Sequence, residues 1–244
     1  MPVNNQHPLI VAIDGPAGAG KSTVASAVAA ELGLPYLDTG AMYRAIGLLA
    51  LRCDIVPPFD DEDVAKLTEL CAGKHLRVEA ADGATRVLLD DEDVSAEIRA
   101  PRCSEMASAV SAVSAVRRAL VPLQQFIGRQ GGGVMEGRDI GTVVFPDADL
   151  KIFLTASENE RARRRHNDLV GSGIDAEFDD VLEQQKARDE RDSTREDSPL
   201  AVASGARILD TTGMSLDEVV AAVLEELENS LDSTGQENVR SRNY

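Results

Sequence analysis

The segment Gly15–Ser22 reads Gly-Pro-Ala-Gly-Ala-Gly-Lys-Ser and matches the phosphate-binding pattern G-x-x-x-x-G-K-[ST] at every fixed position. The apolar run at residues 9–13 directly before it indicates a buried strand. Val24, Val28 and Leu32 then place an apolar stripe on the segment that follows, as in an amphipathic helix. Strand, loop and helix arrive in the order that this pattern requires, so the sequence predicts an α/β fold that binds nucleotide phosphates.

The residue types in this loop suit that chemistry. Glycines let the backbone turn its N–H groups inward toward phosphate oxygens, and the following helix N-terminus adds a favourable dipole. Lys21 can place a charge between the β- and γ-phosphates, and the Ser22 hydroxyl can ligate Mg²⁺. A Gly-rich turn that only caps a helix is the alternative, and the flanking strand and helix disfavour it. The expected ATP-binding residues are Gly15, Pro16, Ala17, Gly18, Ala19, Gly20, Lys21, Ser22 and Thr23.

Composition narrows the class of protein. With 244 residues and 43% hydrophobic content, the chain suits one substantial α/β domain with insertions. Its net charge of −17 disfavours a nucleic-acid partner, and no apolar stretch has the length of a membrane span. The first residues have neither the basic start nor the apolar core of a signal peptide, and the three cysteines lack C-x-x-C spacing. We therefore expect a cytoplasmic monomer that binds small phosphorylated ligands, with no nucleic-acid or membrane partner.

Periodicity and turn residues outline the remaining elements. Strands are expected at residues 34–38, 134–136, 149–154 and 207–210, and helices at about 40–51, 60–70, 102–129 and after the capping box Ser215–Glu218. Residues 75–79 and 85–89, separated by Asp82-Gly83, are typical of a β-hairpin inserted in a parallel fold. Pro122 either starts a new helix or kinks one. The polar residues beyond about 231 are expected to fray.

Two segments imitate nucleotide-binding motifs. Val87–Asp91 resembles a Walker B strand, but it belongs to the expected hairpin, away from the parallel sheet. Asp210–Gly213 resembles the D-x-x-G of a GTPase, but it comes near the end of the chain and no Asn-Lys-x-Asp accompanies it. We assign neither segment a role in catalysis.

Positive charge is concentrated between residues 161 and 195 of this otherwise acidic chain. Arg161 and Arg165 are four residues apart on an expected helix, so both point to one side. Arg188, Arg191 and Arg195 form one helical stripe if that helix persists through Thr194, and Gly171–Gly173 offers a flexible loop between the two helices. One interpretation is a pair of solvated charged helices; the other is a mobile lid that phosphates order. Because a phosphate-monoester acceptor is mostly ionised at neutral pH, its kinase needs cations more than a base.

Four segments together resemble the bacterial cytidylate kinases, a family of nucleoside monophosphate kinases, over about residues 9–228. They are Gly15–Thr23, Leu37–Arg44, Glu136–Thr142 and Arg188–Asp192 with Arg195. The resemblance implies transfer of the γ-phosphate of ATP to CMP or dCMP with Mg²⁺. It also implies a three-layer P-loop NTPase fold with a central parallel sheet, an inserted NMP-binding subdomain containing a small antiparallel sheet, and a helical lid. The alternatives are a P-loop kinase of another nucleoside monophosphate or small metabolite, and a non-catalytic nucleotide-binding switch.

By position, the resemblance also implies roles for individual residues. The catalytic set is Lys21, Arg138, Arg161, Arg165 and Arg195, with Arg161 and Arg165 near the ATP phosphates and Ser22 on the metal. The CMP-binding set is Thr39, Tyr43, Arg44, Ser108, Arg117, Gly137, Arg138, Asp139, Arg188, Asp192 and Arg195. Within it, Arg44, Arg138 and Arg195 hold the acceptor phosphate, Ser108, Arg117 and Asp139 read the cytosine edge, and Arg188 with Asp192 contacts the sugar hydroxyls.

Some of these residues have plainer interpretations. Tyr43 can belong to the core, and Asp38 with Thr39 can simply cap the helix that starts near Gly40. Glu136 stands where some members of the family carry aspartate, so its role beyond local support stays open. The resulting domain hypothesis is a P-loop core of residues 9–59, 100–160 and 196–230, a CMP-binding insertion of residues 60–99, a lid of residues 161–195 and a disordered tail of residues 231–244.

Overall fold

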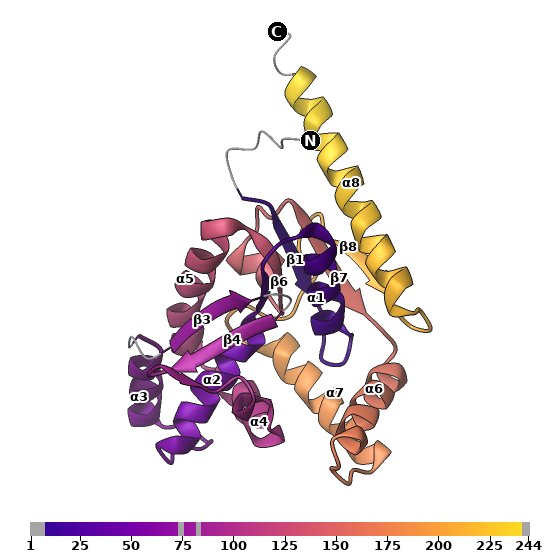
Figure 1. Cartoon of the computed structure of the whole chain (residues 1–244). Coiled ribbons are helices and arrows are strands. Elements are labelled where there is room, and N and C mark those ends of the chain that lie inside the picture. Colours follow the sequence, from indigo (N-terminus) through magenta and orange to yellow (C-terminus); the bar gives the residue numbers. More distant parts are fainter. Residues whose placement is uncertain (1–7, 73–75, 82–83, 241–244) are drawn as a thin grey trace.

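The computed structural model describes residues 8–72, 76–81 and 84–240. Within these residues, five parallel strands form the central sheet in the order β2-β6-β1-β7-β8 (Figure 1). The strands are β1 (Ile10–Asp14), β2 (Tyr36–Asp38), β6 (Gly133–Gly137), β7 (Leu150–Thr155) and β8 (Arg207–Asp210). The expected α/β class and parallel sheet are therefore confirmed.

The register of this sheet decides where the site forms. All five residues of β1 are buried, and its last residue, Asp14, lies opposite Gly137 of β6 and Phe153 of β7. The loop after β1 and the loop after β6 therefore leave the same edge of the sheet side by side. Helix α1 (Lys21–Leu32) follows the first of these loops, which confirms the expected strand, loop and helix.

Helices cover both faces of the sheet. On one face, Val24 and Val28 of α1 and Val219 and Val223 of α8 (Leu216–Arg240) pack in one buried cluster with sheet residues such as Ile13. The other face is covered by the short π-helical segment η2 (Ile140–Val144) and by α5 (Ser114–Gly131). The three expected layers are therefore present.

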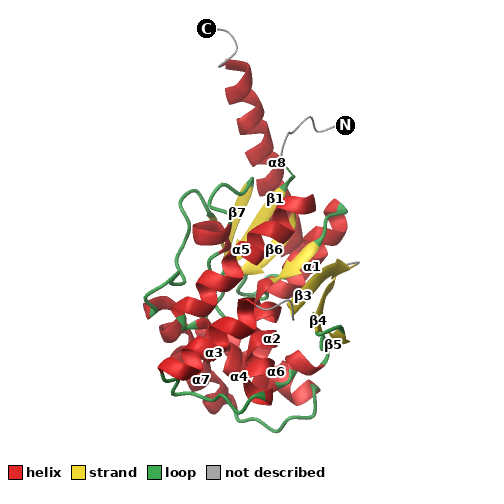
Figure 2. Ribbon diagram, turned by 90° about the vertical axis from the view of Figure 1, so that its left-hand side faces the viewer, coloured by secondary structure: helices red, strands yellow, loops and turns green. Residues whose placement is uncertain are grey.

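A second buried cluster lies beside the sheet, below it in Figure 2. It joins Ile46 of α2 (Thr39–Arg52), Leu67 of α3 (Asp61–Ala72) and Leu120 of α5 to a small antiparallel sheet. That sheet contains β3 (Leu76–Ala81), β4 (Ala84–Leu89) and β5 (Glu92–Asp93), followed by the 3-10 turn η1 (Glu97–Arg99). The hairpin is confirmed and β5 is an addition to it, whereas His75 and the turn at Asp82-Gly83 lie outside the described residues.

The expected helix over residues 102–129 is two helices. Helix α4 (Pro101–Ser111) ends before Ala112, and α5 starts at Ser114 after a bend of 102°. Pro122 lies inside α5 and is exposed, so the alternative that it starts a new helix is wrong. The buried side chains of Val116, Leu120 and their neighbours hold the helix together across the missing N–H. No single helix among the described residues is long and apolar enough to cross a membrane. Helices α4 and α5 taken together have the length and apolar composition of a span, but they are bent by 102° relative to each other.

The last helices complete the fold. Helix α6 (Glu158–Gly171) and helix α7 (Phe178–Thr194) form a hairpin on the side of the molecule opposite α3 (Figure 1). Ser215 and Glu218 form the expected capping box, because the Ser215 backbone N–H donates to Glu218 and the Glu218 N–H donates back to the Ser215 hydroxyl. Helix α8 continues to Arg240, past residue 231 where the sequence analysis expects the chain to fray, and its end projects away from the body.

Candidate active site

A cleft of about 1060 Å³ opens between the P-loop, α2, α4 and α5 on one side and the α6–α7 hairpin on the other. Most of the residues expected at the site line it: Ala17, Gly18, Gly20, Lys21, Ser22, Thr23, Thr39, Tyr43, Arg44, Ser108, Arg117, Gly137, Arg138, Asp139, Arg165, Arg188, Asp192 and Arg195. Gly15, Pro16, Ala19 and Arg161 are not among the lining residues. One cleft therefore brings together side chains that are far apart in the sequence.

The packing of the P-loop explains the absence of Gly15. Gly15 is packed against β7, where a Cβ would collide with the carbonyl oxygen of Leu154, so this glycine serves close packing rather than contact with the cleft. Gly20 has a φ of 87°, in the left-handed region that favours glycine, and caps α1. Lys21 donates from Nζ to the carbonyl oxygen of Pro16 at 2.7 Å. Burial, aided by the nearby Arg138 charge, lowers the Lys21 pKa to about 7. An anionic ligand beside this amine would stabilise its protonated form.

Glu136, near the end of β6, lies next to the P-loop residues Lys21 and Ser22. Tyr36 donates its hydroxyl to Glu136 Oε1 at 2.6 Å, and Thr39 donates its hydroxyl to the Glu136 carbonyl oxygen at 2.7 Å. Burial raises the Glu136 pKa, while Lys21 and the Ser22 hydroxyl act in the opposite direction. Glu136 thus lies beside Ser22 and Lys21, a position that the sequence analysis left open. Asp38 caps α2 by accepting from the Ala41 N–H at 3.0 Å, so the capping interpretation holds for Asp38, whereas Thr39 bonds to β6.

Arg117 of α5 and Asp139, just after β6, form a buried ion pair that lines the cleft. The Arg117 guanidinium also lies 5.3 Å from the centre of the Tyr43 ring, within cation–π range. Burial raises the Tyr43 pKa to about 12, so this phenol stays neutral. Ser108, on α4, is buried next to the same part of the cleft. The Ala/Ser/Val-rich stretch therefore places Ser108 where the resemblance implied.

Three further arginines, Arg138, Arg188 and Arg195, line the same cleft around Asp192. Arg138 donates from Nε to Asp192 Oδ2 at 2.9 Å, and Arg195 Nη1 lies 3.8 Å from Asp192 Oδ1. Burial would raise the Asp192 pKa, but Arg138, Arg188 and Arg195 together lower it. Burial and the Arg138 charge lower the Arg188 pKa to about 10. One carboxylate thus faces three guanidinium groups, which leaves this part of the cleft with excess positive charge.

Several buried polar atoms of the cleft have no hydrogen-bond partner among the described residues. They are Tyr43 Oη, Arg44 Nε, Ser108 Oγ, Arg117 Nε, Gln185 Oε1, Arg188 Nε and Arg195 Nη2. Arg44 does form an ion pair with Asp38 at 2.5 Å through its Nη2. Because buried polar groups in proteins are almost always satisfied, four unpaired guanidinium N–H groups in one cleft indicate an anionic ligand rich in acceptor oxygens.

The α6–α7 hairpin contacts the P-loop at the carbonyl oxygen of Ala17. Ala17 O accepts from Arg161 Nη1 at 3.0 Å and from Gln185 Nε2 at 2.7 Å. Arg161 also pairs with Asp189 at 2.5 Å, which joins the two helices. Arg161 is therefore buried against the P-loop while Arg165 lines the cleft, so the two side chains have different surroundings in this conformation. The cause is that Ala17 O and Asp189 offer Arg161 acceptors in place of solvent.

Comparison with known proteins decides the family. The cytidylate kinase family model matches residues 11–229. The chain belongs to the cytidylate kinase family. The cytidylate kinase of Caldicellulosiruptor bescii is 47% identical over 215 residues, which cover 88% of this chain and 93% of that protein. The cytidylate kinase of Caldanaerobacter subterraneus is 50% identical over 215 residues, covering 88% and 92%. A solved structure of an uncharacterised Eubacterium ventriosum protein has a TM-score of 0.50 at 13% identity over 91% of this chain and 98% of that one, a likeness of fold alone.

In this member of the cytidylate kinase family, three further residues join the site that the sequence analysis did not single out. Gln185 holds the Ala17 carbonyl, and Arg164 donates to Thr211 O at 2.9 Å and to Ala19 O at 3.4 Å. The third is Asp14, whose two carboxylate oxygens accept backbone N–H groups of Ile140 at 2.8 Å and Gly141 at 2.7 Å. Spacing gives no sign of contacts between residues more than 100 positions apart. The one signal in the sequence is that Asp14, an ionisable residue, directly follows the apolar strand at residues 9–13.

Proposed function

We propose that this chain transfers the γ-phosphoryl group of ATP to CMP or dCMP, producing ADP and CDP or dCDP. The observation that carries the proposal is that one cleft is lined by the P-loop, by the buried Arg117–Asp139 pair and by arginines with unpaired N–H groups. Two nucleotides that repel each other need such a cationic bridge. Membership in the cytidylate kinase family supports cytosine as the acceptor base.

The Arg117–Asp139 pair suits the cytosine edge. Cytosine offers an amino donor beside the acceptors N3 and O2, so a carboxylate and a guanidinium complement it better than they complement uracil. In this proposal Asp139 accepts from the base amino group, and the free Arg117 Nε and Ser108 Oγ bond to the base. Tyr43 and Thr39 line the same part of the cleft.

The acceptor phosphate lies among Arg44, Arg138 and Arg195 in this proposal. Arg44 and Arg138 are each held in place by an acidic partner, and Arg44 and Arg195 each have a buried nitrogen without a hydrogen-bond partner. A dianionic phosphate can therefore accept charge-assisted hydrogen bonds from side chains that are already in position. Arg188 and Asp192 then face the sugar. The phosphate of a nucleoside monophosphate is already largely ionised at neutral pH, so these residues orient a nucleophile and no general base is required.

On the donor side, Lys21 and the P-loop N–H groups hold the ATP phosphates. Lys21 leaves the Pro16 carbonyl and binds phosphate oxygens, which stabilises its protonated form. Arg165 contacts the same phosphates from α6, and Arg161 joins it by exchanging Ala17 O for phosphate as the lid, residues 161–195, closes. The closed lid excludes water, so that transfer to the acceptor prevails over hydrolysis.

The residues around Ser22 fit Mg²⁺. The Ser22 side chain is exposed to the cleft at the first turn of α1, with the Glu136 carboxylate beside it, so the available donors are the hard oxygens that Mg²⁺ prefers. Among the described residues no group of three or more His, Cys, Asp or Glu side chains could hold a metal. That composition suits an ion carried by nucleotide phosphates and water rather than by a protein cage. When bound, Mg²⁺ neutralises charge on the β- and γ-phosphates.

A coupled assay of ADP release with CMP, dCMP, UMP, AMP and shikimate as acceptors tests this proposal. We expect turnover with CMP and dCMP that exceeds turnover with the other acceptors by at least about tenfold in kcat/KM. Preference for another acceptor would identify a different small-molecule kinase. Tight ATP binding without transfer to any acceptor would identify a non-catalytic nucleotide switch.

A further inference from the structure

Asp14 joins the donor half of the site to the acceptor half. It is the last residue of β1 and immediately precedes Gly15, where the P-loop begins. Its carboxylate is 3% exposed and accepts from the N–H groups of Ile140 and Gly141 at 2.8 and 2.7 Å. These two residues directly follow Arg138 and Asp139, the pair that faces the acceptor in the proposed function. One buried side chain thus links the two loops that leave the sheet edge together.

The two N–H groups need this partner. Segment η2 starts at Ile140, and its first backbone bonds run from the Val143 and Val144 N–H groups to the Asp139 carbonyl at 2.9 and 3.1 Å. The N–H groups of Ile140 and Gly141 precede that ladder and find no partner within the segment. Asp14 supplies one carboxylate oxygen to each, so it fixes where η2 begins.

The same contacts fix the side chains before η2. Asp139 is bonded to Arg117 through its carboxylate and to η2 through its carbonyl, and Arg138 is bonded to Asp192 of the lid helix α7. A shift of the η2 start therefore moves both residues relative to the P-loop. Misplacement of a reacting group by about 1 Å can reduce a rate about 100-fold.

Resting on the proposed function, we propose that Asp14 is a positioning residue that holds Arg138 and Asp139 in line with the P-loop, so that acceptor and donor phosphates meet at the reacting distance. Asp14 touches no substrate in this role. It acts through the backbone of Ile140 and Gly141, and its loss separates two halves that each keep their own ligands.

The test is Asp14→Asn, with Asp149→Asn as the matched control. Asp149 accepts the Ile10 N–H at 2.8 Å at the opposite end of the same strand β1, far from the cleft edge of the sheet. Asparagine keeps the volume of aspartate but presents one acceptor oxygen, so its amide group faces one of the two N–H groups. Both variants replace one carboxylate oxygen with an amide NH2 group at one end of β1, so both test the effect of removing that charge from the strand, but only Asp14→Asn removes the acceptor of an N–H group beside the cleft.

We expect Asp14→Asn to lower kcat by about 10- to 100-fold and to raise the CMP dissociation constant about tenfold, with ATP-analogue affinity within about threefold of wild type. Asp149→Asn should keep all three values within about threefold, even where its melting temperature falls. Calorimetry with CMP and a non-hydrolysable ATP analogue measures both affinities. Equal effects of the two variants on kcat and CMP affinity would overturn the proposal.

Two further measurements separate the possible failures. If Asp14→Asn does not fold, hydrogen exchange in the wild-type protein replaces it: an ATP analogue at the P-loop should slow exchange of the Ile140 and Gly141 amides at least about threefold. Unchanged exchange would overturn the proposal. Absence of wild-type turnover with any acceptor would contradict the proposed function, while the calorimetric difference between the two variants would still support the link through Asp14.

Discussion

Arg117 and Asp139, which both line the cleft, form an ion pair in which the two residues are only 3% and 4% exposed. They come from α5 and from the loop after β6, so the pair also joins α5 to the end of a central strand. Desolvating two charges costs about as much as their attraction returns, so a buried pair of this kind is a weak source of stability. Its position in the cleft instead supports a role in recognition.

Asp139→Asn should change the choice of acceptor base. The amide that replaces one carboxylate oxygen can donate to the O4 of uracil, whereas the carboxylate can only accept from the cytosine amino group. We expect the ratio of kcat/KM for CMP to that for UMP to fall at least about tenfold, with the KM for ATP within about threefold. Asp197→Asn is the control, because Asp197 pairs with the exposed neighbour Arg118 at 2.9 Å. An unchanged ratio in Asp139→Asn would contradict the assignment of Asp139 to the base.

The same pair makes a prediction about stability. Asp139→Ala leaves the buried Arg117 charge uncompensated, so the free energy of unfolding should fall by about 3–5 kcal/mol. Asp197→Ala removes an exposed partner and should cost less than about 1 kcal/mol. The double variant Arg117→Met/Asp139→Leu removes both charges and should be more stable than Asp139→Ala. Urea denaturation of the three variants measures these differences, and a loss in Asp139→Ala no larger than that in Asp197→Ala would refute the prediction.

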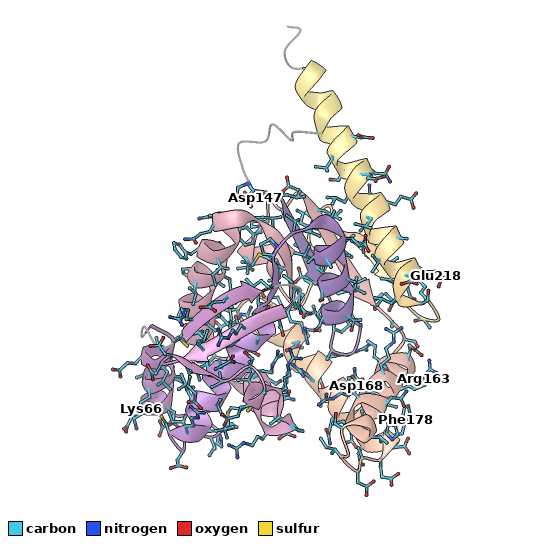
Figure 3. The ribbon with its side chains drawn as sticks, in the orientation of Figure 1. Lys66, Asp147, Arg163, Asp168, Phe178 and Glu218 are labelled. Carbon is cyan, nitrogen blue, oxygen red and sulfur yellow. The ribbon has the colours of Figure 1, made fainter. Side chains whose placement is uncertain are left out.

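Lys21→Ala should slow the chemical step. The Lys21 ammonium supplies charge to the transferring phosphoryl group, and loss of one such electrostatic partner reduces kcat by about 100- to 1000-fold. Lys66→Ala is the control, because Lys66 is an exposed lysine on α3 that pairs with Glu62 at 2.7 Å (Figure 3). Steady-state kinetics with saturating CMP separates the two. Turnover of Lys21→Ala within about threefold of wild type would remove the P-loop lysine from the mechanism.

The local parts of this site were predictable because their chemistry is contained in short segments. The P-loop reveals itself by glycine spacing between an apolar strand and an amphipathic helix, and the Ser215–Glu218 capping box marks the start of α8 to the residue. The extent of α7 also follows from the spacing of Arg188, Arg191 and Arg195, since the helix does persist to Thr194 and Arg195 caps it. In each case the residues that identify the element lie in one continuous segment of the sequence.

The parts that were missed depend on contacts between distant segments. The contacts of Arg161 with Ala17 O and Asp189 could not be predicted from its spacing to Arg165. Segment η2 (Ile140–Val144) was not predicted, and it begins where Asp14, 126 positions earlier, accepts the Ile140 N–H group. Pro122 was expected to start or kink a helix, but α5 already begins at Ser114 and continues through it, because its buried face outweighs one lost hydrogen bond.

Asp14 also predicts how stability depends on pH. Burial raises its pKa from 3.8 to about 6 in the folded protein, although the Gly141 and Ile140 N–H groups act in the opposite direction. Between these two values the folded state binds a proton that the unfolded state lacks, so this group makes folding more favourable as the pH falls. The asparagine of Asp14→Asn does not titrate. Subtracting the unfolding free energy of this variant from that of the wild type at each pH therefore removes the contribution of the other titrating groups and leaves that of Asp14. The wild type should therefore gain about 2 kcal/mol on the variant between pH 7.5 and pH 4.5 and show a constant difference above pH 7.5. Urea denaturation of both proteins across this range measures the gain, and a difference that stays flat or falls toward pH 4.5 would show that the Asp14 carboxylate is not destabilised by its burial.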